Sequence, residues 1–208
     1  MPVVAVPASI EKGAMHDKQT LRDELIAARK AHHAAHGAKA AQALVARLDD
    51  LAPAPQSRIG LYLPVGSEMD CRPLMRALDE AGHGLCLPVC TEADAALAFR
   101  AYAPGDVLFE DALGMAAPPA SAAPCHPDMM LLPLIGFDAS GMRLGRGGGY
   151  YDRTLAAWRT DPAFAQKQVV SCGVAYDMQM VDKCPAAPHD QALDAVITET
   201  TFYRFARS

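Results

Sequence analysis

The chain has 208 residues, of which 51% are hydrophobic, and this is enough to bury one substantial core in a single domain. Its formal net charge of −5 argues against an extended nucleic-acid surface, because such surfaces normally carry a basic excess. The 6 cysteines form no C-x-x-C pair, so the sequence indicates neither a zinc knuckle nor a disulfide framework and favours reduced, cytosolic thiols.

Residues 1–17 begin with the apolar stretch MPVVAVPASI, which prolines interrupt and which is far too short to span a bilayer. We expect a flexible N-terminal extension here, followed by one α/β domain over residues 18–208. No later segment has eighteen uninterrupted apolar residues. The sequence therefore predicts a soluble, cytoplasmic protein without a membrane partner.

Residues 17–50 are rich in alanine, leucine and basic residues, which predicts one long helix or two helices separated near Gly37. Lys18 and Arg22 are four residues apart and share one helical face, and Arg29 lies close to that face two turns later. On the sequence alone, a solvated basic face explains this pattern better than a binding site. Three histidines of the same helix are expected to be solvated: His32, His33 and His36.

The segment RIGLYL at residues 58–63 is typical of a core strand, and Pro64 ends it. Glu68 follows the next turn, at a strand-to-helix edge where ligands gather in open α/β sheets. A helix-capping carboxylate is an equally good interpretation of Glu68. The following helix is expected from near Pro73 to Gly82.

The remaining chain alternates strands with helices, which predicts an α/β domain with a mainly parallel sheet. Residues 97–102 alternate only in part, which suits an edge or antiparallel strand. Residues 114–127 are dense in alanine and proline and indicate a loop. The other expected strands are 85–89, 128–134, 168–175 and 195–198, and a helix is expected over 153–159.

Residues 131–152, LLPLIGFDASGMRLGRGGGYYD, join an apolar strand to a turn, a glycine-rich loop and a helix start. Glycines at 145, 147, 148 and 149 permit positive φ and close approach of a ligand, and Arg143 and Arg146 add fixed positive charge. Free N–H groups before a helix N-terminus favour anions such as polyphosphates. A mobile surface loop is the alternative, and the glycine spacing excludes both the dinucleotide fingerprint and the Walker loop.

This stretch resembles the signature FD-x-x-G-x-RLGRGGGYYD of the 5-formyltetrahydrofolate cyclo-ligases, also called 5,10-methenyltetrahydrofolate synthetases. The resemblance extends over residues 18–200. Its other segments are Lys18-Gln-Thr-Leu-Arg22, Tyr62-Leu63 followed by Glu68, Val174-Ala-Tyr-Asp177 and Pro188-His-Asp190. It implies a single three-layer domain with a Rossmann-like, mainly parallel sheet flanked by helices, as in NagB, RpiA and the CoA transferases.

The resemblance implies an ATP-dependent cyclisation of 5-formyltetrahydrofolate to 5,10-methenyltetrahydrofolate, with release of ADP and phosphate. Phosphoryl transfer to the formyl oxygen would create a leaving group, and N10 would then attack the activated carbon. ATP, Mg²⁺ and the folate would be the only ligands of a monomer without nucleic-acid partners. Two alternatives stay open: a nucleotide- or folate-binding relative without turnover, and an ATP-using enzyme acting on another N-formyl substrate.

Site residues follow from the same resemblance. Catalytic roles are implied for Arg146 and Tyr150. ATP contacts are implied for Lys18, Arg22, Arg143, Leu144, Gly145, Arg146, Gly147, Gly148, Gly149, Tyr150 and Tyr151. Folate contacts are implied for Leu63, Glu68, Arg146, Gly147, Gly148, Gly149 and Tyr150, and magnesium ligands are Asp152 and Asp190. From the residues alone, a helix cap is the slightly better interpretation of Asp152, and one of the two tyrosines is equally well a core residue.

The chain departs from the family pattern at two places. Where the family usually has G-I-x-E-P, this chain has Gly114-Met-Ala-Ala-Pro118, so the glutamate is missing. Gly148 stands where some members have lysine. We therefore expect the phosphate charge to be carried by the remaining cations: Lys18, Arg22, Arg143 and Arg146.

Overall fold

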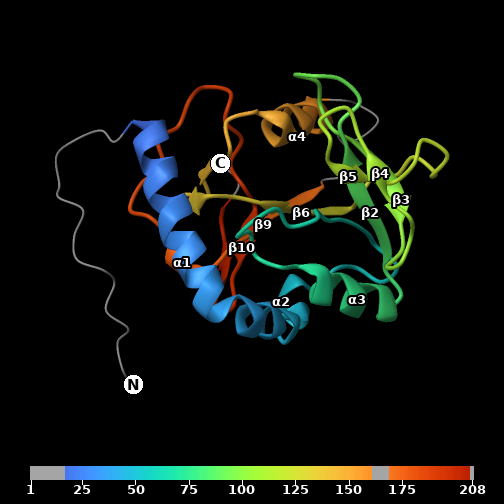
Figure 1. Ribbon diagram of the computed structural model, residues 1–208, viewed down its shortest axis with the longest axis horizontal. Coiled ribbons are helices and arrows are strands. Elements are labelled where there is room, and N and C mark those ends of the chain that lie inside the picture. Colours follow the sequence, from blue (N-terminus) through green and yellow to red (C-terminus); the bar gives the residue numbers. More distant parts are fainter. Residues whose placement is uncertain (1–16, 161–168, 207–208) are drawn as a thin grey trace.

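The computed structural model describes residues 17–160 and 169–206, and a seven-stranded sheet lies at their centre (Figure 1). The strand order is β11-β10-β9-β6-β1-β2-β3. The parallel strands are β1 (Arg58–Gly60), β2 (Gly84–Val89), β6 (Met129–Pro133), β9 (Val170–Val174) and β10 (Ala195–Ile197). The edge strands β3 (Ala98–Tyr102) and β11 (Phe202–Arg204) are antiparallel to their neighbours. The predicted, mainly parallel sheet is confirmed, as is the antiparallel edge position of β3.

Helices cover both faces of this sheet. In Figure 1, α4 (Tyr150–Thr160) lies above it, and α2 (Leu48–Leu51) and α3 (Arg72–Glu80) lie below it. The long α1 (Lys18–Val45) stands at one side, and the short helix η1 is Asp177–Gln179. Along β6, Leu131 packs in the core between the sheet and helices α1 to α3. Met130 and Leu132 point to the other face and pack in the core between the sheet and α4. This alternation explains why β6 is apolar at every position.

Two small hairpins were not predicted, because strands of two residues leave no periodic pattern. The pair β4 (Phe109–Glu110) and β5 (Ala116–Ala117) lies partly in the predicted loop 114–127. The pair β7 (Gly136–Phe137) and β8 (Arg143–Leu144) holds the stretch between β6 and the glycine loop. The expected turn after Phe137 is therefore the closed end of a hairpin.

Several boundaries differ from the predictions. The first helix runs through the buried Gly37 without a break and ends at Val45, so the alternative of two helices separated near Gly37 is wrong. The strand predicted over 58–63 ends at Gly60. Helix α4 begins at Tyr150, before the predicted start at 153, and Gln168 lies outside the described residues. No helix in the described part of the chain is long and apolar enough to cross a membrane.

Strand β1 marks the point where the strand order reverses. The next strand, β2, lies on one side of β1, and β6 lies on the other side. Loops that leave the carboxyl ends of such neighbouring strands diverge and open a crevice. Here these loops are residues 61–68 after β1 and residues 134–149 after β6.

Gly173 on β9 tests the packing of the sheet against α4. A Cβ atom there would lie 2.5 Å from Leu134 Cδ2 and 2.9 Å from Leu193 Cδ1. Both leucines are buried, so we expect Gly173→Ala to lower the free energy of unfolding by about 1–3 kcal/mol. The control is Gly84→Ala, because its Cβ would meet only Arg58 Cγ, at 3.6 Å. Urea unfolding measures both, and equal midpoints for the two variants would contradict this account.

Candidate active site

The exit of the chain from β6 is fixed by two side chains. The carbonyl oxygen of Leu134 accepts a hydrogen bond from Arg29 Nη1 (3.1 Å) and another from Gln179 Nε2 (2.9 Å). Gln179 Nε2 also donates to Ile135 O, and its Oε1 accepts from the Tyr176 N–H. Both Arg29 and Gln179 are buried. The end of β6 is thereby tied to α1 on one side and to η1 on the other.

The hairpin after β6 is closed by Asp138, which is buried. Its Oδ1 accepts the backbone N–H groups of Ser140 and Met142, and its Oδ2 accepts the N–H of Cys184 at 2.8 Å. Leu144 packs on Leu21 of α1 in a small core of its own. The hairpin therefore holds Arg143 and the following glycines in one orientation.

The glycine loop joins this hairpin to α4. Gly147 and Gly149 have φ values of +99° and +66°. Residues with a side chain rarely adopt such positive φ values, so glycine is required at both positions. Arg22 Nε donates to Gly145 O at 2.8 Å and anchors the loop to α1. Because the 11-residue helix α4 begins at Tyr150, the loop ends at a helix N-terminus, which attracts anions.

Glu68 and Arg146 join the two loops of the crevice. Arg146 donates to Glu68 Oε1 through Nε (3.1 Å) and lies 3.0 Å from it through Nη2. The Val65 N–H donates to the other carboxylate oxygen, Oε2, at 2.9 Å. Glu68 is 5% exposed, whereas the Arg146 side chain is 55% exposed. Two of the residues with implied folate contacts are thus brought together from different loops.

The two aspartates also meet at this edge. Asp152 Oδ1 accepts hydrogen bonds from Arg143 Nη2 (2.7 Å) and from the Gln191 N–H (2.9 Å). Asp190 Oδ2 accepts from Lys18 Nζ (2.6 Å) and from the Ala187 N–H. Asp152 lies inside the first turn of α4, where its carboxylate binds Arg143 and a distant backbone group, so the helix-cap interpretation is wrong. No group of three or more His, Cys, Asp or Glu side chains in the described ranges could hold a metal by itself.

The two tyrosines have different surroundings. Tyr151 packs against the core beneath α4, and burial raises the pKa of its hydroxyl well above the usual range. Tyr150 lies at the loop, where the guanidinium of Arg153 covers its ring at 4.8 Å. The interpretation of one core tyrosine therefore fits Tyr151. Leu63 is half-buried beside the core on the α1 side.

A cleft of about 650 Å³ lies between α1 and the turn at residues 65–67. It is lined by Gln19, Arg22, Ile26, Arg29, Lys30, His33, Ala34, Val65, Gly66, Ser67, Ile135 and Arg146. His33 was predicted to be solvated, but its Nδ1 forms a 2.7 Å hydrogen bond with the buried hydroxyl of Tyr176. The cleft adjoins the crevice between the loops after β1 and β6.

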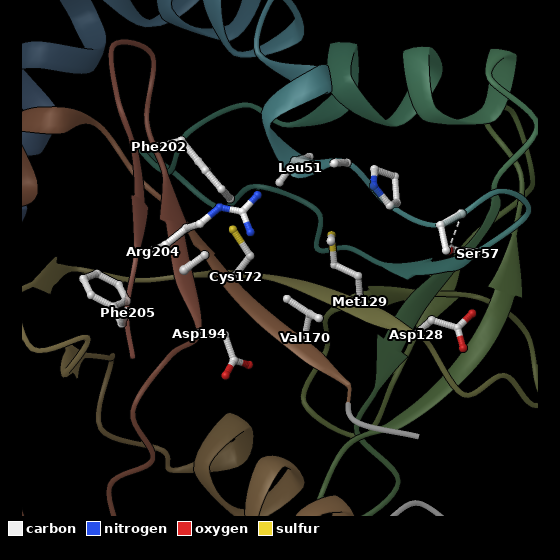
Figure 2. Close-up of a pocket in the computed structure, with 14 residues that line it drawn as sticks. Leu51, Ser57, Asp128, Met129, Val170, Cys172, Asp194, Phe202, Arg204 and Phe205 are labelled. Atoms are coloured by element: carbon white, nitrogen blue, oxygen red, sulfur yellow. Dashed lines mark hydrogen bonds between the residues drawn. The ribbon is translucent and has the colours of Figure 1, made fainter. Parts of the chain in front are cut away.

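A second hollow, of about 540 Å³, lies at the opposite end of the strands (Figure 2). Its two carboxylates are already engaged. Asp128 Oδ2 accepts the Arg58 N–H, and Asp194 Oδ2 accepts both the N–H and the hydroxyl of Ser171. Because ligands of open α/β sheets bind at the carboxyl ends of the strands, the cleft beside the glycine loop is the better candidate.

Sequence reasoning missed the contacts of four polar residues in this region. Arg153 donates to Gly148 O at 2.8 Å, and Gln191 donates to Asp152. Arg153 directly follows Asp152, and Gln191 directly follows Asp190. Their position next to an expected magnesium ligand is the only sequence feature that indicates them. Arg29 and Gln179 act over long sequence separations, and no local pattern marks them.

Comparisons with known proteins agree with this geometry. Residues 14–199 match the model of the 5-formyltetrahydrofolate cyclo-ligase family. The chain is 34% identical over 155 residues to a 5-formyltetrahydrofolate cyclo-ligase of Escherichia coli, covering 71% of this chain and 80% of the relative. A Mycolicibacterium smegmatis protein of the same name is 38% identical over 146 residues, covering 66% of this chain and 71% of that protein.

Two solved structures share the fold. The 5,10-methenyltetrahydrofolate synthetase of Aquifex aeolicus superposes with a TM-score of 0.72 and 25% identity, covering 92% of this chain and 95% of the other. The enzyme of the same name from Mycoplasma pneumoniae superposes with a TM-score of 0.64 and 26% identity, covering 88% of this chain and 99% of the other. The sheet order and the crevice described above therefore belong to a fold that known synthetases use.

The Lys18–Asp190 pair gives a pH prediction. Burial raises the pKa of Asp190, but the hydrogen bonds from Lys18 and the Ala187 N–H outweigh it and hold the pKa below its ordinary value. We expect Lys18→Met to raise this pKa, measured by carboxyl NMR titration, whereas Lys39→Met at an exposed position should leave it unchanged.

The lowered pKa of Asp190 also predicts how the stability of Lys18→Met differs from that of wild type. A carboxyl group with a lowered folded-state pKa stabilises the fold above its unfolded pKa of about 4, and this contribution is lost as the pH falls through the folded pKa. Wild type should therefore be more stable than Lys18→Met at neutral pH and equal to it in strong acid. An unchanged Asp190 titration in Lys18→Met would contradict the pairing.

Proposed function

The chain belongs to the 5-formyltetrahydrofolate cyclo-ligase family, and from this premise we propose that the crevice at the ends of β1 and β6 is its active site. The observation that supports the proposal is the meeting of distant segments at one edge. Glu68 comes from the loop after β1, Arg146 from the glycine loop, and Asp190 from a late loop next to Asp152. We propose one catalytic domain from residue 18 onward, active as a monomer.

The reaction of this chain is the ATP-dependent cyclisation of 5-formyltetrahydrofolate to 5,10-methenyltetrahydrofolate. The γ-phosphoryl group passes from ATP to the formyl oxygen, and ADP leaves. N10 then attacks the activated carbon and releases its proton, a new C–N bond forms, the C–O bond breaks, and phosphate carries away the oxygen. Such chemistry needs positioning and charge stabilisation from the protein rather than a covalent nucleophile.

We assign the ATP phosphates to the glycine loop and the cations around it. Glycine at 147 and 149 lets the loop take positive φ, which is typical of anion-binding loops, and α4 adds its N-terminus. Arg22 already touches the loop at Gly145. The proposed ATP-binding residues are Lys18, Arg22, Arg143, Leu144, Gly145, Arg146, Gly147, Gly148, Gly149, Tyr150 and Tyr151.

We assign the folate to the β1 side of the crevice. The buried carboxylate of Glu68 can accept hydrogen bonds from a pterin ring, and Leu63 offers apolar contact nearby. Arg146 bridges the two substrates, because it belongs to the glycine loop and contacts Glu68. Tyr150 offers a half-exposed ring at the end of the same loop. Arg146 and Tyr150 are therefore the proposed catalytic residues.

The donor set fits Mg²⁺ bound mainly through phosphate oxygens. Among the described residues, the hydrogen bonds of Asp152 go to Oδ1 and those of Asp190 go to Oδ2. Each carboxylate thus keeps one hard oxygen that accepts no hydrogen bond from these residues, although Asp190 Oδ1 lies 3.7 Å from His189 Nε2. Mg²⁺ is usually held by one or two carboxylates together with substrate phosphates and water. When bound, it would neutralise charge on the phosphates. Asp152 and Asp190 are the residues that would hold it.

The two alternative functions are not favoured. The relatives that match most of this chain carry the cyclo-ligase name, and the family model extends over residues 14–199. The sequence departures fall outside the residues that form the crevice contacts, apart from Gly148. The 6 cysteines are buried and unpaired, which supports a reducing compartment such as the cytoplasm.

An absorbance assay tests the function directly. Purified protein with Mg²⁺, ATP and 5-formyltetrahydrofolate should generate the near-ultraviolet band of the methenyl product, and omission of ATP should abolish it. The product must form in proportion to the ADP released, because one phosphoryl transfer accompanies each ring closure. Binding of ATP and folate without this band would favour a non-catalytic relative.

Asp152→Asn tests the magnesium assignment. The substitution removes the charge that holds a cation, so we expect turnover to fall by at least about 100-fold at ordinary Mg²⁺ concentrations. Stability should also fall, by about 1–3 kcal/mol, because the buried Arg143 loses its ion pair.

The control for this stability loss is Leu78→Ala, which removes buried contacts of α3 and lowers the free energy of unfolding by about 2–5 kcal/mol without touching the crevice. It should keep most of the turnover at a temperature where both variants are folded. Turnover is measured against Mg²⁺ concentration together with a melting curve. Near-normal turnover in a folded Asp152→Asn protein would remove Asp152 from the metal site.

A further inference from the structure

Two cations contact the glycine loop from different helices. Arg22 donates from α1 to Gly145 O, and Arg153 donates from the first turn of α4 to Gly148 O at 2.8 Å. The family resemblance implies an ATP contact for Arg22 but not for Arg153. The second cation therefore lies at the loop without an assigned role.

The guanidinium of Arg153 is held in one orientation. Its Nε donates to Ala95 O at 3.2 Å, its Nη2 donates to Gly148 O, and its carbon lies 4.8 Å from the centre of the Tyr150 ring. A Cβ atom at Gly149 would lie only 2.7 Å from Nη1, so this nitrogen lies directly beside the loop. Among the described residues, none accepts a hydrogen bond from Nη1.

The positive charge of Arg153 is poorly neutralised within the described part of the chain. Its one ion pair there is with Asp94, whose Oδ1 lies 4.0 Å from Nη2 and whose side chain is 92% exposed. Such a pair contributes little. A cation in the first turn of a helix also lies near the positive end of the helix dipole, which is unfavourable. An anion bound at the loop would relieve both effects.

Gly148 explains why a second cation is needed here. Some family members have lysine at this position, and Gly148 is not among the glycines with positive φ, so its backbone conformation would accept a side chain. However, a Cβ atom there would lie 2.9 Å from Cε2 of Tyr150, the ring that Arg153 covers. A lysine at 148 and the observed arrangement of Tyr150 and Arg153 therefore exclude each other.

We propose that Arg153 binds ATP, with Nη1 donating to a phosphate oxygen at the glycine loop, and that it replaces the lysine that position 148 lacks. This inference rests on the proposed function, because it takes the loop as the phosphate site. The planar guanidinium suits the role, since Nε and Nη2 can keep their bonds to the two carbonyl groups while Nη1 contacts the phosphate.

Steady-state kinetics with ATP and folate varied in turn test the proposal. Arg153→Gln keeps a hydrogen-bond donor but loses the charge, so it should raise the KM for ATP about tenfold and leave the KM for the folate unchanged. Arg153→Lys keeps the charge but loses the planar fork, and it should raise the KM for ATP only about threefold. Arg76→Gln is the matched control, since Arg76 is exposed on α3 and does not line the cleft.

A transfer of the charge to position 148 separates phosphate binding from a purely structural role. In the double variant Gly148→Lys/Arg153→Gln, the Tyr150 ring is no longer held by Arg153 and can make room for the new side chain. The KM for ATP should then return to within about threefold of wild type. Arg153 acting only as a clamp predicts no recovery, because the bond to Ala95 O stays lost. Melting curves show whether the double variant folds, and if it does not, equal ATP KM values for Arg153→Lys and Arg153→Gln reject a role for the charge.

Three results would overturn the proposal. They are an unchanged KM for ATP in Arg153→Gln, an equal rise of the KM for ATP and for the folate, and no recovery in a folded double variant. A failure of the proposed site is recognised separately, because Arg22→Gln would then also leave the KM for ATP unchanged. If wild-type protein forms no methenyl product, calorimetric binding of ATP replaces the kinetics, and equal affinity of wild type and Arg153→Gln still rejects the role of Arg153.

Discussion

The carbonyl oxygen of Leu134 accepts hydrogen bonds from Arg29 and Gln179, and the position of the glycine loop depends on them. Strand β6 is buried on both faces, so its backbone polar groups need protein partners where the strand ends. The two side chains provide them from α1 and from η1. The path of the chain beyond β6 is thereby fixed. The hairpin closed by Asp138 follows on this path and leads to the loop that contains Arg146.

Three ion pairs join the segments that meet at the crevice. Lys18 pairs with Asp190, Arg143 with Asp152, and Arg146 with Glu68. The first and third pairs include a partly exposed side chain, and such pairs stabilise a fold only weakly. In the proposed site, phosphates and a pterin would therefore replace these two pairings at little cost in stability. The Arg143–Asp152 pair differs, because Arg143 is buried, so it is the fixed part of the site.

The sheet and the loop were predictable because each has a local cause in the sequence. The apolar run at residues 129–134 indicates a strand buried on both faces, and positive φ requires glycine at 147 and 149. The hairpin β7–β8 was not predictable, because strands of two residues carry no period, and no expected strand covered β11. The contact of Arg29 with Leu134 was not predictable either. Its partner Leu134 is 105 residues away, and only the fold brings the two together.

Gly148 shows how the loop accommodates its departure from the family pattern, in which some members have lysine. A Cβ at this position would lie 2.9 Å from Cε2 of Tyr150, so glycine allows the tyrosine ring to fold back onto the loop. Arg153 covers that ring, and its Nη2 donates to the Gly148 carbonyl at 2.8 Å. A positive charge therefore lies against Gly148 although the side chain at 148 carries none. Arg153, in the first turn of α4, provides this charge. Its guanidinium lies between the Tyr150 ring and the Gly148 carbonyl.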